Sequence, residues 1–117
     1  MTLGEKQRLF TRFIGQLIAW AYANDYELTF GDAYRSPKVF GKMGTRKGYG
    51  RSRSNHKQRL AVDFNLFKWN GSRWVYQTST AAHRPLAEYW ESLHGLCAAG
   101  YRFNDGNHYS MEHMGRR

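Results

Sequence analysis

Two residues that can do chemistry lie in the stretch SNHKQRLAVDFNLF, residues 54–67. His56 is in its polar, basic beginning, and Asp63 is inside the apolar run that follows. If that run is a strand, Val62 and Phe64 point to one side of it and Asp63 points to the other. An ionised carboxylate on a buried, unpaired sheet face is costly. We therefore expect Asp63 to be solvent-exposed, paired with an arginine or bound to a metal ion.

A second pair of candidate residues follows near the end of the chain, where Asp105 stands three residues before His108. Two histidines and one aspartate, with a fourth position left for water, suit a catalytic zinc ion. A further carboxylate near that water is what zinc hydrolases use as general base. This chemistry makes His56, Asp63 and His108 candidate zinc ligands and Asp105 the candidate base. The chain has five histidines, so the spacing alone is also compatible with the absence of a metal site.

His113 competes with His108 for the place of the last ligand. Only His108 has an acid three residues before it, so we prefer His108. Glu112 and His113 remain candidates for orienting a ligand through a hydrogen bond.

The other histidines and the single cysteine have simpler interpretations. We expect His83, near a predicted helix start, to be exposed, and His94 to lie on a helix surface. Cys97 is expected to be a small core residue of the same helix, not a nucleophile. A lone cysteine also excludes an intramolecular disulfide.

The stretch SNHKQRLAVD resembles the first zinc motif of the M15 family of peptidases, which comprises D-alanyl-D-alanine carboxypeptidases and phage endolysins. That motif reads Ser-x-His, four residues, then Ala-x-Asp. Its places are filled here by Ser54, His56, Ala61 and Asp63. The family's second motif, an acid, two residues and a histidine, is matched by DGNH at 105–108, and its Tyr-Arg-Ser by residues 34–36. The small size and the tail NHYSMEH are most similar to the phage endolysin branch.

The resemblance implies a role for each matched position. His56, Asp63 and His108 would hold one Zn²⁺ per chain. Asp105 would take a proton from the zinc-activated water and later pass it to the leaving amine.

The resemblance also implies substrate contacts. Arg35 would bind a substrate carboxylate or the developing oxyanion, a task suited to its planar fork. Ser54 would orient the site by hydrogen bonding. Arg59 departs from the family, since many members carry glycine at this position. The departure leaves the ligand set unchanged and leaves the substrate preference open.

As to function, the resemblance implies a zinc metallopeptidase that cleaves the stem peptides of bacterial peptidoglycan. The endolysin branch implies an L-alanyl-D-glutamate endopeptidase, and a D-Ala-D-Ala carboxypeptidase with the same site is the alternative. Such a bacteriolytic phage enzyme is made in the host cytoplasm and acts on the cell wall after the membrane has been opened. The start MTLGEKQRLF lacks the apolar stretch of a secretory signal, so we expect no signal peptide. A monomer is expected.

The charge distribution favours an anionic partner. The formal net charge is +9, and no acid occurs between Asp32 and Asp63, an interval that holds half of the eighteen basic residues. This basic loop, at about 36–57, suits the anionic bacterial envelope and would raise encounter rates at low salt. A basic nucleic-acid-binding protein is a second hypothesis, but it leaves the ordered His and Asp pattern unexplained, so no nucleic acid is expected. A catalytically inactive wall binder is a third, and the complete set of ligands and base counts against it.

The candidate site residues must be positioned by a single domain, residues 1–117, that has few helices and strands. A helix is predicted from Thr2, whose spacing to Glu5 is that of a capping box, to about Asn24. Strands are predicted at 26–30, 60–69 and 72–77, with a hairpin turn at Asn70-Gly71.

A second helix is predicted from about Ala82 to Ala99, with Pro85 in its first turn and Gly100 as its stop. After it we expect a short strand, a turn at Asp105-Gly106 and another short strand. The prediction is an α+β fold of two main helices packed on a small, mainly antiparallel sheet. The resemblance implies that of the zinc D-Ala-D-Ala peptidase (Hedgehog-like) fold.

Overall fold

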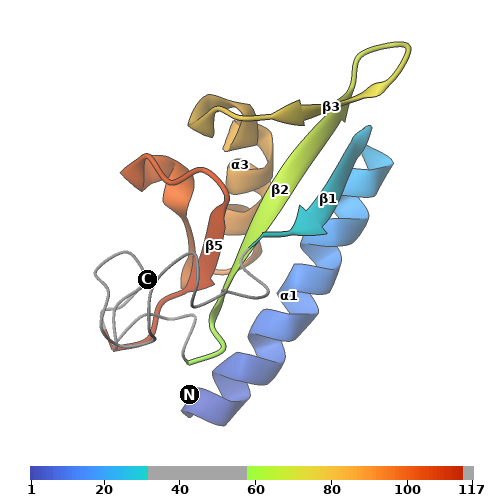
Figure 1. The fold of residues 1–117 in the computed structure, drawn as a ribbon. Coiled ribbons are helices and arrows are strands. Elements are labelled where there is room, and N and C mark those ends of the chain that lie inside the picture. The colour runs from blue at the N-terminus through green and yellow to red at the C-terminus, as the bar shows by residue number, and fades with distance from the viewer. Residues whose placement is uncertain (32–57, 115–117) are drawn as a thin grey trace, which may run out of the picture.

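The computed structural model describes residues 1–31 and 58–114, so the predicted basic loop at 36–57 lies outside the described residues. In chain order the elements are α1 (Leu3–Ala23), β1 (Tyr26–Phe30), β2 (Ala61–Trp69), β3 (Trp74–Gln77), the 3₁₀ turn η1 (Thr80–His83), α3 (Arg84–Leu93), β4 (Cys97–Ala99), the 3₁₀ turn η2 (Gly100–Phe103) and β5 (His108–Met111). The fold is α+β, with two helices on a small antiparallel sheet, as predicted (Figure 1).

The nine-residue strand β2 organises the sheet, whose order is β1-β2-β5-β4, with β3 also paired to β2. β1 occupies one edge of β2. The other edge is shared: β5 pairs with Ala61–Asp63, and β3 pairs with Leu66–Trp69. All of these pairings are antiparallel. The partner on this edge therefore changes half-way along the strand, between Asp63 and Leu66.

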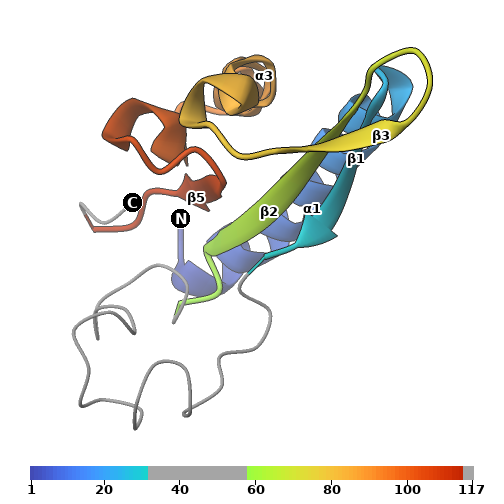
Figure 2. The same ribbon diagram turned by 45° about the horizontal axis from the view of Figure 1, so that its top comes forward.

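Both helices lie on the same side of β2, and they contact each other as well as the sheet (Figures 1 and 2). Phe10 of α1 packs edge-to-face on Trp90 of α3, with ring centroids 5.7 Å apart. Phe64 and Leu66 are at most 1% exposed, because they point from β2 into this core. Asp63 is on the opposite face, as the alternation of side chains along a strand requires. No helix among the described residues is long and apolar enough to cross a membrane.

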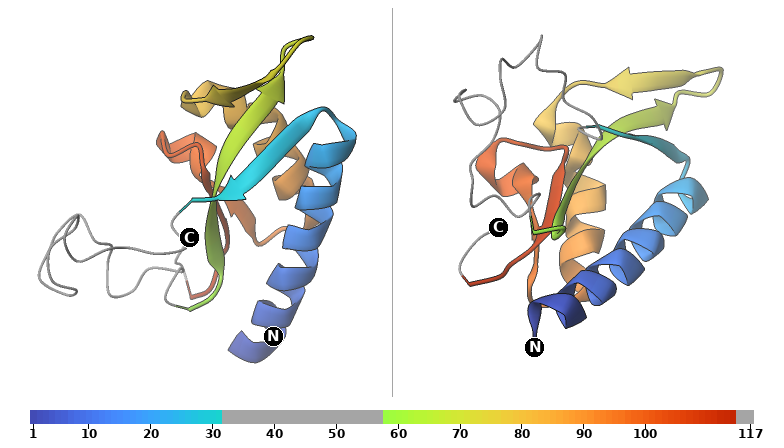
Figure 3. Two further views of the ribbon diagram at one scale, coloured as in Figure 1. Left: turned by 45° about the vertical axis from the view of Figure 1, so that its right-hand side comes forward. Right: turned by 60° about the horizontal axis from the view of Figure 1, so that its bottom comes forward.

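The N-terminal helix and the hairpin follow local sequence signals. The capping box of Thr2 and Glu5 is present, and Asn24 caps the C-terminal end of α1, as predicted. The β2–β3 hairpin is also confirmed, and it extends past the rest of the sheet (Figure 3). Its connection is longer than the predicted Asn70-Gly71 turn, since β2 ends at Trp69 and β3 begins at Trp74, which leaves residues 70–73 between the paired strands. The hairpin register thus depends on the whole segment 70–73.

The second helix is present with Pro85 in its first turn, as predicted, but it starts two residues after Ala82 and the predicted end at Ala99 is wrong. Residues 80–83 form η1, α3 ends at Leu93, and Cys97–Ala99 is the strand β4. Residues 97–99 of the apolar run 96–99 form a strand because they pair with β5, where Ala98 lies opposite Ser110. Gly100 consequently begins η2 and does not end a helix, and the strand predicted after it is this 3₁₀ turn.

Trp90 holds this C-terminal part of the sheet to α3. Its side chain is fully buried, and the indole N–H lies 3.1 Å from Ala98 O and 3.0 Å from Ser110 O. One donor therefore serves a carbonyl on each of the two paired strands β4 and β5. Buried carbonyls that lose such a donor are costly.

We predict that Trp90→Phe lowers the free energy of unfolding by about 2 kcal/mol or more, because both carbonyls lose the indole N–H and the smaller phenyl ring leaves a void in the core. Trp74→Phe is the control, since Trp74 is 39% exposed, and it should cost less than about 1 kcal/mol. Urea denaturation of both variants measures the difference. Equal losses in the two variants would contradict the role given to the indole N–H.

Candidate metal centre

The pairing of β2 with β5 brings two of the predicted ligands together. Asp63 lies directly opposite His108 in the register of the two strands. His108 Nδ1 is 3.2 Å from Asp63 Oδ1, and the two side chains are only 15% and 10% exposed. Forty-five positions of sequence separate these residues, so this contact depends on tertiary structure.

The register of this pair is fixed by the core on the other face of the sheet. Val62 lies opposite Tyr109, and the Tyr109 ring is fully buried between Phe64 and Trp90. A slip of one residue would turn the buried ring to the outer face. Burial of the aromatic side chain therefore holds Asp63 and His108 face to face.

The burial of Asp63 excludes one of the three environments expected for it from the sequence. The residue is 8% exposed, so it is not a solvent-exposed carboxylate. Its backbone carbonyl accepts a 2.7 Å hydrogen bond from Gly31 N–H at the end of β1. A Cβ at Gly31 would lie 3.1 Å from Asp63 Cβ, so β1 approaches the site closely because this residue is glycine.

Asp105 lies on the turn that leads into β5. His108 N–H donates to Asp105 O at 3.1 Å, and Asp105 N–H donates to Gly100 O at 2.8 Å. Asn104 adopts a left-handed conformation with φ 60°, which reverses the chain before Asp105. The candidate base is exposed and belongs to the same tight turn as the candidate ligand His108.

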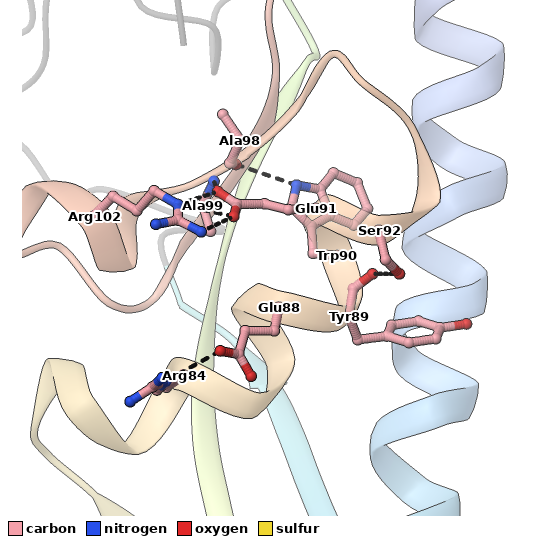
Figure 4. A network of polar contacts seen from close by, with 9 residues as sticks. All are labelled: Arg84, Glu88, Tyr89, Trp90, Glu91, Ser92, Ala98, Ala99 and Arg102. Atoms are coloured by element: carbon pink, nitrogen blue, oxygen red, sulfur yellow. Dashed lines mark hydrogen bonds and ion pairs between the residues drawn. The ribbon is translucent and has the colours of Figure 1, made fainter.

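Glu91 of α3 fixes where this turn begins (Figure 4). Its carboxylate accepts hydrogen bonds from Ala99 N–H at 3.1 Å and from Arg102 Nε at 2.9 Å. Arg102 Nη2 is also 2.8 Å from Glu91 Oε1. The helix is thereby attached to both ends of the segment that contains Gly100.

His56, Arg35 and Ser54 lie outside the described residues. Within residues 1–31 and 58–114 no group of three His, Cys, Asp or Glu side chains is close enough to hold a metal ion. The described part of the chain thus supplies two neighbouring donor groups, one nitrogen and one oxygen.

The remaining histidines and the cysteine near the candidate ligands have other contacts. His113 Nδ1 lies 2.9 Å from Lys6 Nζ of α1, and Lys6 also donates to Glu112 O. Cys97 is buried in β4, and burial raises the pKa of its thiol to about 12, which makes it a poor nucleophile. His94 is half-buried at the end of α3, where its Nδ1 accepts a hydrogen bond from Leu96 N–H.

The prediction that His83 is exposed is wrong. The residue is 4% exposed, and its Nδ1 is 2.7 Å from Tyr109 Oη. Burial lowers the pKa of the imidazole to about 4, so the ring is neutral at pH 7. It lines a pocket of about 210 Å³ together with Asp105, Gly106 and Asn107 of the turn that leads into β5. No local sequence signal marks His83, because its burial depends on the distant Tyr109.

No protein-family model matches this chain, and no curated protein matches it.

We predict that Gly100→Ala disrupts the turn between η2 and β5. An added Cβ would collide with Asp105 O and would lie 2.7 Å from His108 Cβ. Gly95→Ala is the matched control, because nothing lies within 4 Å of a Cβ there. We expect Gly100→Ala to lower the free energy of unfolding by about 2 kcal/mol or more and Gly95→Ala to change it by less than about 0.5 kcal/mol. Indistinguishable thermal unfolding of the two variants would contradict the close packing at Gly100.

We further predict a pH-dependent effect of His83→Asn. The neutral imidazole has a folded-state pKa near 4 against about 6.5 when unfolded, so its stabilising contribution is complete above pH 6.5 and is lost as the pH falls toward 4. The loss is about 3 kcal/mol at most. Asparagine does not titrate, so the stability gap between wild type and variant should narrow from pH 7.5 to pH 4.5 in urea denaturation. A gap that is constant or widens toward acid would show that His83 is not held neutral.

Proposed function

We propose that the protein is a zinc-dependent peptidase that cleaves the stem peptides of bacterial peptidoglycan, of the phage endolysin type and with the zinc D-Ala-D-Ala peptidase fold. The observation that carries the proposal is the Asp63–His108 pair. Two residues singled out by separate motifs lie opposite each other on neighbouring strands.

The distance within the pair fits two ligands of one zinc ion. Donor atoms that each lie about 2.0–2.1 Å from a tetrahedral zinc are about 3.3 Å apart. His108 Nδ1 and Asp63 Oδ1 are 3.2 Å apart. The low exposure of both side chains also suits a centre in which donor groups are oriented before the metal binds. His56 is the proposed third protein ligand.

The backbone at Arg59 provides separate support for the resemblance. Arg59 has φ 59°, in the left-handed region that glycine adopts without steric cost. This is the position at which many members of the M15 family carry glycine. In this chain an arginine adopts the left-handed conformation just before β2, and its exposed side chain precedes the strand that carries Asp63.

In this proposal each residue of the site has a defined role. Zinc, when bound, supplies Lewis-acid polarisation of the scissile carbonyl and of the attacking water. Asp105 accepts the proton of that water and returns it to the leaving amine, a role that suits an exposed carboxylate on the turn that carries His108. Arg35 binds a substrate carboxylate or the oxyanion, and Ser54 orients the site.

The substrate proposed first is the L-alanyl-D-glutamate bond, and the D-Ala-D-Ala bond is the alternative for the same centre. The place of action is the cell wall, which the enzyme reaches from the host cytoplasm once the membrane has been opened. The formal net charge of +9 supports association with the anionic envelope. Mass spectrometry of the fragments released from defined peptidoglycan identifies the bond that is cut.

Zinc content and lysis together test the proposal. We predict about one zinc per chain by elemental analysis of the purified protein, and loss of that zinc in His108→Ala because one imidazole ligand is removed. His94→Ala is the control and should keep its zinc, since His94 binds the backbone of Leu96. Asp105→Asn should also keep zinc but lose at least about 100-fold in lysis of purified cell walls.

Two results would contradict the site as described. Full zinc in His108→Ala, with loss in His113→Ala, would move the last ligand to His113. Full lytic activity of Asp105→Asn would place the general base elsewhere.

A further inference from the structure

A polar pocket opens where β2 changes partner between β5 and β3. The chain leaves β3 after Gln77 and runs through Thr78, Ser79 and Thr80, facing the turn that contains Asp105 and Asn107. Thr80 Oγ1 accepts a 3.2 Å hydrogen bond from Gly106 N–H, which joins the two walls. The pocket, of about 210 Å³, is smaller than the 300–1,000 Å³ typical of sites for drug-sized ligands, so it suits one residue of a longer chain.

His83 contributes a buried nitrogen to this pocket. Its Nδ1 contacts Tyr109 Oη, and Nε2 has no hydrogen-bond partner among the described residues. In the described part of the chain, Gln58 Oε1 is the one side-chain polar atom that is both fully buried and without a hydrogen-bond partner. Nε2 has no partner among these residues either, so it is not fully buried. Because the residue is 96% buried and lines the pocket, the pocket is the route by which Nε2 is accessible.

The contact with Tyr109 decides which imidazole nitrogen carries the proton. The Tyr109 hydroxyl is fully buried, and within the described residues His83 Nδ1 is its hydrogen-bond partner. A buried hydroxyl with one acceptor in reach donates to it. Nδ1 is therefore the acceptor, and the neutral ring carries its proton on Nε2. The pocket thus contains an N–H donor held in a fixed direction by β5, the strand of His108.

We propose that this pocket is a substrate subsite that takes a neutral amide-bearing residue of the peptide, with His83 Nε2–H donating to its carbonyl oxygen. Asp105 is the one ionised side chain among the described residues that line the pocket, so a free carboxylate is disfavoured and an uncharged amide is favoured. The remaining polar lining consists of amide and hydroxyl groups, such as those of Asn65, Gln77 and Asn107. The inference rests on the proposed function, because Asp105 is the proposed base beside the scissile bond.

The variant His83→Asn tests the subsite. The asparagine amide occupies the place of Nδ1 and keeps a partner for Tyr109, but nothing replaces Nε2. With a soluble disaccharide-pentapeptide muropeptide as substrate, which contains both candidate bonds and is used in its glutamate-amidated form, we expect KM to rise about 10-fold, which corresponds to one lost hydrogen bond, while kcat stays within about 3-fold. His83→Gln is the matched variant, because its longer side chain returns an amide N–H to the place of Nε2. It should keep KM within about 3-fold of wild type. Zinc content should be unchanged in both variants.

The outcomes separate the subsite from the function. Cleavage by wild type with an unchanged KM in His83→Asn would overturn the subsite and leave the peptidase intact. If wild type does not cleave the muropeptide, the proposed function fails, and the same muropeptide becomes the titrant in amide NMR. Saturating shifts at Thr80, Gly106 and Asn107 that weaken about 10-fold in His83→Asn would then uphold the subsite. Absence of those shifts would overturn it.

Discussion

The candidate metal centre depends on the burial of an ionisable pair, Asp63 and His108, where β2 pairs with β5. Two titratable groups on a half-covered sheet face are costly unless each has a partner. The structure compensates this cost by placing the carboxylate and the imidazole opposite each other, and it fixes their register through Tyr109 and Phe64 on the core face. The hydrophobic core thus determines which polar groups meet on the outer face.

Several contacts around the pair act on the short segment that leads into β5. Trp90 joins β4 to β5 with one indole N–H, and Glu91 binds the backbone before η2. Gly100 allows the chain to pass against Asp105 and His108. All three lie on or after α3, so this helix positions the C-terminal motif as well as covering the sheet. A zinc centre built on strands held in this way would be oriented before the metal binds.

The local elements could be predicted from the sequence, because their signals are local. The capping box of Thr2 and Glu5, the alternation along β2 and the Asn70-Gly71 pair depend on neighbouring residues. The extent of α3 could not be predicted in this way. The apolar run at 96–99 suits a helix or a strand, and pairing with β5 decides for the strand.

The residues of the candidate site also differ in whether local sequence signals could identify them. The spacing of Asp105 and His108, and the place of Asp63 within an apolar alternating strand, identify these residues from the sequence. The structure brings Asp63 and His108 together. The pocket residue His83 was not identified, because its polar, helix-start sequence resembles that of an exposed histidine. In the structure it is buried, and its ring contacts the distant Tyr109. Sequence patterns therefore identify the groups that carry chemistry more readily than the groups that surround a substrate.

We propose that His108 and Asp63 are ligands of one zinc ion. X-ray absorption at the zinc edge, on the purified zinc-loaded protein, tests it most directly, because it reports the donor atoms and their distances. We predict four light donors at about 2.0–2.1 Å, with the scattering pattern of two imidazoles and no sulfur, and loss of one imidazole in His108→Ala. A zinc ion with sulfur among its ligands, or a spectrum that is unchanged in His108→Ala, would contradict it.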